Sequence, residues 1–133
     1  MESLSIQETA IAVGEIEKRV ADKPSSDPVR AKQVIEVTVA AGLGVSCTEL
    51  RARTRRSAST AFARQVAMYL AHVVYGLNLT ESGHLFGRDR TTAAHACSVV
   101  EDRRDDPSFD TQMDQLEHAI LRLQKITMLP RAC

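Results

Sequence analysis

The chain has 133 residues, with 17 Lys and Arg balanced by 17 Asp and Glu, so its formal net charge is zero. A chain of this length buries one core, and we expect one domain. Its 44% hydrophobic and 26% charged residues are ordinary for a globular protein, and no run reaches the roughly 18 apolar residues of a membrane span. The acidic start "MESLSIQETA" lacks the basic and apolar pattern of a secretory signal, so we expect a cytoplasmic protein with no membrane partner.

The sequence shows no metal or catalytic pattern. Cys47, Cys97 and Cys133 lie far apart and form no CxxC pair, which predicts neither a disulfide nor a zinc site. No nucleophile elbow or paired-carboxylate spacing accompanies the histidines, which fall on different predicted helices: His72, His84, His95 and His118. We therefore expect no enzyme activity, no metal and no cofactor.

Charge is unevenly distributed along the chain. Residues 51–90 contain seven arginines and two acids, whereas residues 101–117 contain seven acids and two arginines. Such asymmetry marks an interaction surface only if folding gathers the arginines on one face.

In chain order, a first amphipathic helix is predicted over residues 6–20, because apolar residues recur there at steps of three and four. The linker "ADKPSSDP" ends it. Asp27 and Pro28 then form a helix start, with a capping acceptor followed by a proline at the first position, and this helix should reach about Ala41. Ser46 and Glu49 form a capping box for a short third helix.

A basic loop is predicted between Arg51 and Ser59, because "RARTRRSAST" has too much charge to bury. A fourth, apolar helix should follow over residues 60–75 and end at Gly76. Its core candidates are Phe62, Val66, Tyr69, Leu70 and Val73.

Asn78 and Glu81 cap a predicted fifth helix over residues 79–86, which Gly87 closes. A sixth helix opens at Asp89 and runs to about Asp102, and a seventh is capped by Ser108. The apolar stripe of the seventh helix comprises Leu116, Ile120, Leu123 and Ile126. The fold class predicted is thus all-α, a compact helical bundle of about six or seven helices.

The fifth and sixth helices, joined by a tight turn with a glycine, have the arrangement of a helix-turn-helix, whose second helix enters the DNA major groove. On the sixth helix, small and apolar residues face inward: Ala93, Ala96, Cys97 and Val100. The solvent side carries Arg90, Thr91, Ala94, His95 and Ser98. An arginine at the leading end can donate two hydrogen bonds to guanine, and a threonine can contact thymine.

The stretch "ARQVAMYLAHVVYGLNLTESGHLFGRDRTTAAHACSVVED" resembles the C-terminal DNA-binding domain of the bacterial replication initiator DnaA family. The shared features are Arg-Gln before an apolar helix with "MYLA", then Leu-x-Glu-x-Gly, then Phe-Gly, Arg-Asp, Thr-Thr and His-Ala. The resemblance runs from about Val34 to Leu121. We expect a domain over residues 28–126, preceded by a helix and linker over residues 1–27 and followed by a tail over residues 127–133.

The resemblance implies a set of DNA contacts. Bases in the major groove would be read by Asp89, Arg90 and Thr91. The DNA backbone would be contacted by Arg64, Gln65, Arg88 and Thr92, by main-chain N–H groups of Leu79 and Thr80, and by His72, which stands where a lysine is common. The basic loop would send an arginine into the minor groove, with Arg53, Arg55 and Arg56 as candidates.

The chain also departs from the family pattern. One of two turn glycines is missing, Arg90 replaces a histidine, Ser82 replaces an isoleucine, and Ala58 stands at the position of the minor-groove arginine. No GxxxxGK[ST] phosphate loop is present, so we expect no nucleotide partner and no ATPase activity. We expect a nucleoid-associated transcription or replication-origin regulator that binds double-stranded DNA, with a homodimer through the N-terminal helix left open. The alternative is a protein-protein interaction module that kept the fold and lost specific DNA binding.

Overall fold

The computed structural model describes residues 27–52 and 57–125, and within them the chain forms helices and no strands. The helices are α2 (Pro28–Leu43), α3 (Cys47–Arg51), α4 (Ala58–Val73), α5 (Leu79–Leu85), α6 (Arg90–Arg103) and α7 (Pro107–Leu123). The all-α prediction is confirmed. The predicted helix over 6–20, residues 53–56 of the basic loop and the tail over 127–133 lie outside the described residues. No helix in the described part is long and apolar enough to cross a membrane.

Helix starts follow the capping residues that the sequence predicts. Asp27 accepts a hydrogen bond from the Val29 amide at 3.1 Å, with Pro28 at the first position of α2. Asn78 and Glu81 form a complete capping box at α5, with both reciprocal hydrogen bonds present. A side chain that accepts from a free first-turn amide fixes where the helix begins, so these starts are set locally.

Two other helix starts differ from the prediction. Helix α4 begins at Ala58, two residues before the predicted Thr60, because Ser57 accepts from the Thr60 amide at 3.1 Å. Helix α7 is capped by Asp106, not Ser108, since Pro107 occupies the first helical position and Asp106 accepts from the Ser108 amide.

At α3, Ser46 caps as expected, accepting from the Glu49 amide at 3.0 Å. The Glu49 carboxylate instead accepts a hydrogen bond from the Thr60 hydroxyl at 3.2 Å, so it ties α3 to α4.

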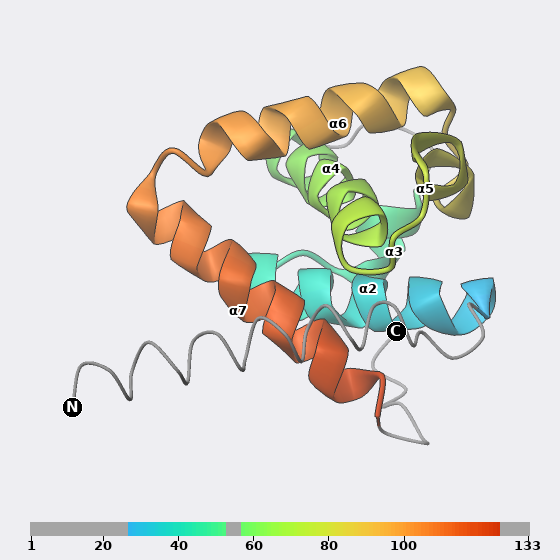
Figure 1. Ribbon diagram of the computed structural model, residues 1–133, viewed down its shortest axis with the longest axis horizontal. Helices are drawn as coiled ribbons and strands as arrows, with labels where there is room; N and C mark the ends of the chain where they lie inside the picture. Colours follow the sequence, from blue (N-terminus) through green and yellow to red (C-terminus); the bar gives the residue numbers. More distant parts are fainter. Residues whose placement is uncertain (1–26, 53–56, 126–133) are drawn as a thin grey trace.

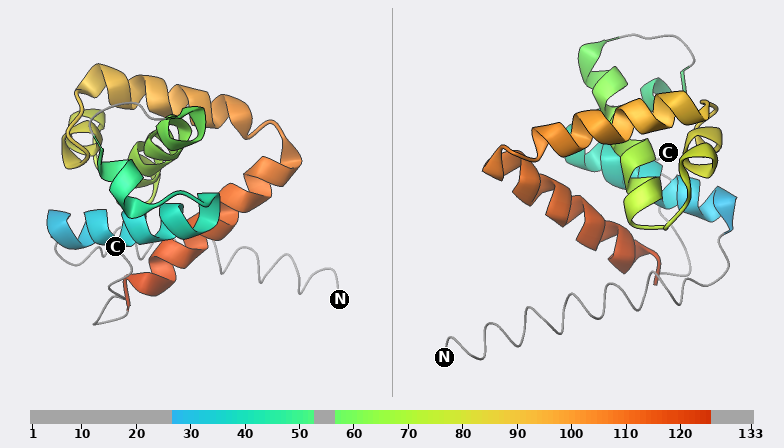
Figure 2. Two further views of the ribbon diagram at one scale, coloured as in Figure 1. Left: turned by 180° about the vertical axis from the view of Figure 1, so that it is seen from behind. Right: turned by 45° about the horizontal axis from the view of Figure 1, so that its top comes forward.

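Helix α4 is the centre of the fold. It packs against α2, α3, α5 and α6, while α7 packs on α2 (Figures 1 and 2). The core that these helices share includes Val34, Ile35 and Val39 of α2, Val66 and Leu70 of α4, and Met113 and Ile120 of α7. Of the predicted α4 core, Val66, Tyr69 and Leu70 are buried and Phe62 is half-buried. Val73 was predicted wrongly: it is 41% exposed, at the last position of α4.

The cysteine prediction also needs correction. Cys47 is disulfide-bonded, although its spacing from the other cysteines predicted no disulfide. Separation along the sequence does not decide which thiols folding brings together. Cys97 is a free, buried thiol on the inner face of α6, and burial raises its pKa. Among the described residues no group of three or more His, Cys, Asp or Glu is placed to hold a metal ion.

A single arginine holds the corner between α6 and α7. Arg104 follows α6 directly, and its guanidinium donates to Asp110 at 2.5 Å and to Asp114 and Glu117 at 2.6 Å. It also donates to the Tyr69 hydroxyl of α4 at 3.0 Å. Three carboxylates of the acidic run of residues 101–117 thus share one cation, and this side chain connects three helices.

Replacing Arg104 with methionine should lower the free energy of unfolding by about 2 kcal/mol, because charged hydrogen bonds to three carboxylates are lost together. Urea denaturation followed by circular dichroism measures the change. Arg122→Met, at an exposed position of α7, is the matched control and should leave the midpoint almost unchanged. Equal effects of the two substitutions would show that the Arg104 cluster does not stabilise the corner.

Candidate nucleic-acid interface

The turn between α5 and α6 is built from backbone hydrogen bonds that converge on the end of α5. The Gly83 carbonyl accepts from the amides of Phe86 at 3.0 Å and Arg88 at 2.8 Å, and the His84 carbonyl accepts from Gly87 at 3.1 Å. Gly87 has a φ of 70°. This is the pattern of a Schellman motif, in which a left-handed residue after the helix satisfies its last carbonyls. Gly87 therefore closes α5 as predicted. The last residue of the helix is Leu85, one residue before the predicted end at Phe86.

Gly83 allows the turn to fold back tightly on α5. A Cβ atom at this position would lie 2.5 Å from the Asp89 carbonyl oxygen and 2.9 Å from that of Arg88. Real Cβ atoms do not approach backbone oxygens so closely, and main-chain atoms cannot rotate away as a side chain can. The close contact sets where α6 begins relative to α5.

The inner face of α6 consists of small residues. Ala93 and Ala96 are fully buried and form a cluster with Met68 of α4, which Leu79 and Phe86 complete. Cys97 and Val100 are buried further along the same face. The inward face predicted for the sixth helix is confirmed in all four residues. Because alanine side chains are short, α6 lies close to α4 and its position depends on close packing.

The leading end of α6 is exposed. Asp89 caps the helix by accepting from the Thr92 amide at 2.8 Å, and Arg90, Thr91 and Thr92 are all exposed. The hydrogen bond from the Thr92 amide, with a smaller contribution from the Thr92 side chain, holds the pKa of Asp89 below its ordinary value. Asp89 is therefore a carboxylate at neutral pH, beside an arginine and two hydroxyls that face solvent.

The residues predicted to contact the DNA backbone differ in their solvent exposure and hydrogen bonds. Thr80 is exposed and Leu79 is half-buried, and both lie in the first turn of α5. Gln65 of α4 is half-buried. His72 is also half-buried, and its Nδ1 is 2.7 Å from the Leu77 carbonyl oxygen, so the ring orientation is fixed by the loop before α5. These backbone roles stay predictions.

Arg64 is 9% exposed and makes internal contacts. Its Nε donates to the Leu50 carbonyl at 3.1 Å and its Nη2 to the Glu49 carbonyl at 3.0 Å. Cations are favoured at the C-terminal end of a helix, where carbonyls lack partners. Arg64 thus fastens the end of α3 to α4, a structural role that the sequence did not indicate; its predicted phosphate contact is untested.

Arg51 was predicted to begin the basic loop, and this was wrong. It is the last residue of α3, and its guanidinium pairs with Glu36 of α2, which is buried. The sequence held one signal for this pair: a carboxylate next to Ile35 on the buried side of α2 needs a cation, because an unpaired buried charge is costly. The candidates Arg53, Arg55 and Arg56 lie outside the described residues.

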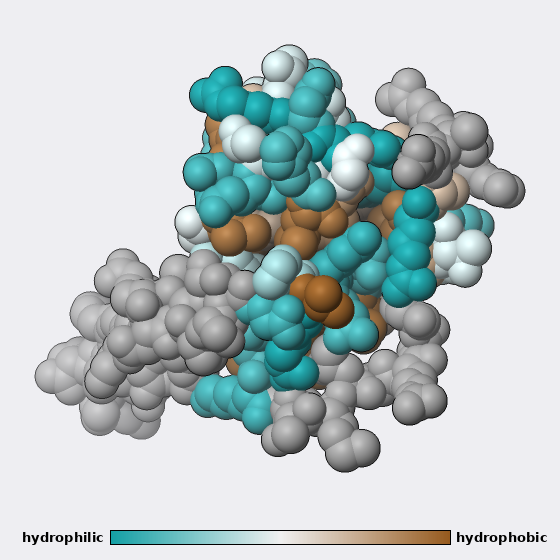
Figure 3. Space-filling model, turned by 90° about the vertical axis from the view of Figure 1, so that its right-hand side faces the viewer, coloured by the Kyte–Doolittle hydropathy of each residue, from teal (hydrophilic) through white to brown (hydrophobic). Residues whose placement is uncertain are grey.

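The residues predicted to read bases thus lie together at one end of the molecule, on the first turn of α6 (Figure 1). Figure 3 faces that side, where hydrophilic residues cover much of the surface and hydrophobic ones gather in the middle. Two helices joined by a tight glycine turn, with the second helix exposed at its leading end, define a helix-turn-helix protein, a class that binds DNA. The family described as "Bacterial dnaA protein helix-turn-helix" matches residues 32–100, so the chain belongs to this family.

Curated relatives agree with the family. Over 95 residues the chain is 38% identical to the chromosomal replication initiator protein DnaA of Symbiobacterium thermophilum, a match that covers 67% of this chain and 20% of that protein. Over 63 residues it is 44% identical to the same-named protein of Lachnoclostridium phytofermentans, covering 46% and 14%. For that of Treponema denticola the identity is 34% over 89 residues, covering 65% and 19%. The chain spans a fifth or less of the length of these relatives.

Gly83→Ala should destabilise the fold by about 1–3 kcal/mol, the usual cost of overpacking, even though alanine favours a helix. Gly87→Ala is the matched control, since an added Cβ there meets nothing within 4 Å and only the positive φ opposes it. Urea denaturation should rank Gly83→Ala as the more harmful. The reverse order would mean that the turn relaxes away from α5 at little cost.

The lowered pKa of Asp89 predicts that the stability of the fold depends on pH. Because its folded-state pKa is lowered, the carboxylate stabilises the fold above its unfolded pKa of about 4, and this contribution is lost as the pH falls through the folded value. Asp89→Asn keeps an acceptor and removes the charge. The wild type should have the higher urea midpoint at pH 6, with the difference disappearing at about pH 2. A difference that is the same at both pH values would rule out the charge as its source.

Proposed function

We propose that this protein binds double-stranded DNA in a sequence-dependent manner, with α6 in the major groove. The observation that carries the proposal is the contrast between the two sides of α6. Its inner face is buried on α4 through Ala93 and Ala96, whereas Arg90 and Thr91 at its leading end are exposed. A rigidly mounted helix with short, polar residues at its exposed start is suited to approach base edges closely.

In this proposal Asp89, Arg90 and Thr91 read bases. Arg90 donates two hydrogen bonds to the O6 and N7 atoms of guanine, the commonest specific contact in the major groove. Asp89 accepts from an exocyclic amine of cytosine or adenine while it caps the helix, so one side chain has both tasks. Backbone phosphates are contacted by Gln65, His72, Arg88 and Thr92, by Arg64, and by the amides of Leu79 and Thr80 at the start of α5. One arginine of residues 53–56 enters the minor groove.

The biological role that we propose is that of a transcription or replication-origin regulator that works without ATPase activity. Such a role implies a nucleoid-associated protein of the cytoplasm. The family supports DNA binding, and the replacement of a histidine by Arg90 at a base-reading position favours a target that differs from the initiator's own site. The domain responsible would comprise residues 28–126.

A second candidate is a protein-protein interaction module. Val29 at the start of α2 is 66% exposed and lines a hollow of about 460 Å³ with Leu77 and Leu85. Exposed apolar surface of this kind is common at protein interfaces.

The departures from the family pattern at Ala58 and Ser82 are compatible with either function. Ala58 is the first residue of α4, and Ser82 is fully buried with its hydroxyl 3.4 Å from the Leu77 carbonyl oxygen.

The two functions are separated by selecting bound duplexes from a random DNA pool at near-physiological salt, followed by affinity measurements on the winners and on scrambled duplexes. An enriched motif bound more tightly than its scrambled version is the expected result. No enrichment, with weak salt-sensitive binding or none, would refute sequence-dependent DNA binding and favour the interaction module.

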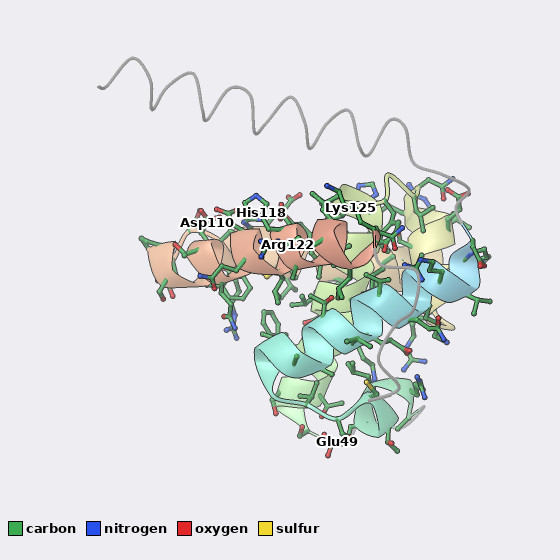
Figure 4. All side chains as sticks on the ribbon, turned by 90° about the horizontal axis from the view of Figure 1, so that it is seen from below. Glu49, Asp110, His118, Arg122 and Lys125 are labelled. Atoms are coloured by element: carbon green, nitrogen blue, oxygen red, sulfur yellow. The ribbon has the colours of Figure 1, made fainter. Side chains whose placement is uncertain are left out.

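Arg90→Ala should weaken binding to the enriched duplex by about 1–3 kcal/mol and relax the preference at one base position. Fluorescence anisotropy with duplexes varied at each position measures both effects. Arg122→Ala removes a cation from α7, on the side of the molecule away from α6 (Figures 1 and 4), and should do neither. A loss that is equal on all sequences would assign Arg90 to the backbone and not to a base.

A further inference from the structure

A cationic cleft lies beside the helix-turn-helix, between α2, α3 and the turn that joins α5 to α6. Its volume is about 450 Å³. Its walls carry three cationic side chains from three separate segments, Lys32 of α2, Arg51 of α3 and Arg88 of the turn, and one acidic side chain, Glu36. No motif in the sequence links Lys32 or Arg51 to the turn.

Arg51 is held in the cleft by a buried carboxylate. Glu36 is 2% exposed, and its Oε1 accepts from both Nε and Nη2 of Arg51 at 3.2 Å. This pairing uses one edge of the guanidinium. The arginine side chain is still 46% exposed, and within the described residues its Nη1 has no acceptor. A guanidinium with one edge fixed and another open is preorganised for a second anion.

The other two cations have no acidic partner. Within residues 27–52 and 57–125, neither Lys32 nor Arg88 forms an ion pair, and both are half-buried. Glu36 offsets one positive charge of the three, so the cleft keeps a surplus of two. Partly buried like charges repel one another, and an anion between them removes that repulsion.

The position of the cleft points to the kind of anion. Arg88 directly precedes Asp89, so the wall of the cleft continues into the leading end of α6. The start of α2, α5 and the start of α6 share one end of the molecule (Figure 1). Duplex DNA carries roughly one charge per 1.7 Å of its axis. A strand whose bases meet Arg90 therefore carries its phosphates past the turn.

The geometry points to Lys32 and Arg51 as a clamp for a DNA backbone phosphate, outside the helix-turn-helix itself and with Arg88 on its other wall. The clamp extends the DNA footprint from the turn to α2 and α3. It contributes affinity on every sequence and no base preference, because phosphates carry no sequence information. This inference rests on the proposed DNA binding.

The test measures the affinity of the full chain for the enriched duplex and its scrambled version by fluorescence anisotropy at several salt concentrations. Lys32→Gln should lower the log–log salt slope by about 0.9, the value for one phosphate contact, and weaken both duplexes several-fold. Lys125→Gln removes the same charge just beyond α7 (Figure 4) and should leave the slope unchanged.

A second variant separates the local contact from global charge and from misfolding. Arg51→Gln alone leaves Glu36 buried without its cation and endangers the fold. The double substitution Glu36→Gln with Arg51→Gln removes the buried pair together and keeps the net charge of the protein. It should still lower the salt slope, with the base preference of the wild type retained.

Three results would overturn the clamp. The first is a salt slope equal to that of wild type for both cleft variants, Lys32→Gln and the double substitution of Glu36 and Arg51. The second is a salt slope for Lys32→Gln that equals that of Lys125→Gln. The third is a changed base preference in either cleft variant. In all three the wild type still selects a motif, so proposed DNA binding survives. Absence of any DNA binding by the wild type would refute the proposed function itself, and the clamp with it.

Discussion

The approach of the turn to Gly83 is the contact on which the rest of the candidate interface depends. A Cβ atom at that position would collide with two carbonyl oxygens, so glycine is the residue that lets the chain reverse directly onto α5. The reversal brings Asp89 to the point where it can cap α6, and the cap decides which residues form the first turn. The position of Arg90 and Thr91 is thus set by a backbone contact several residues earlier in the chain.

Packing against neighbouring helices then fixes the position of α6. The alanines of α6 rest on Met68 of α4, and α4 also packs against α2, α3 and α5. At the far end of α6, Arg104 ties the chain to α4 and α7 through charged hydrogen bonds. Both ends of α6 are therefore restrained, one by close backbone packing and the other by polar contacts.

The sequence predicts features that are encoded over short distances. The caps at Asp27, Asn78 and Asp89 and the inner face of α6 follow from residue type and spacing, and the family resemblance follows from a long, specific motif. Features that arise from packing were missed. The burial of Arg64 depends on where α3 ends against α4, and the pairing of Arg51 with Glu36 depends on how α2 meets α3. Neither of these arrangements leaves a periodic pattern in the sequence.

The hydrogen bonding of the turn has a consequence for how specificity can change. The amides of Phe86, Gly87 and Arg88 all donate to carbonyls of α5, and those of Thr92 and Ala93 donate to Asp89. These amides already have acceptors within the protein, so in the proposed DNA binding base discrimination falls to the side chains at the start of α6. Under the proposed function, side chains such as Arg90 and Thr91 can therefore differ among relatives and read other target sequences without any rearrangement of the backbone.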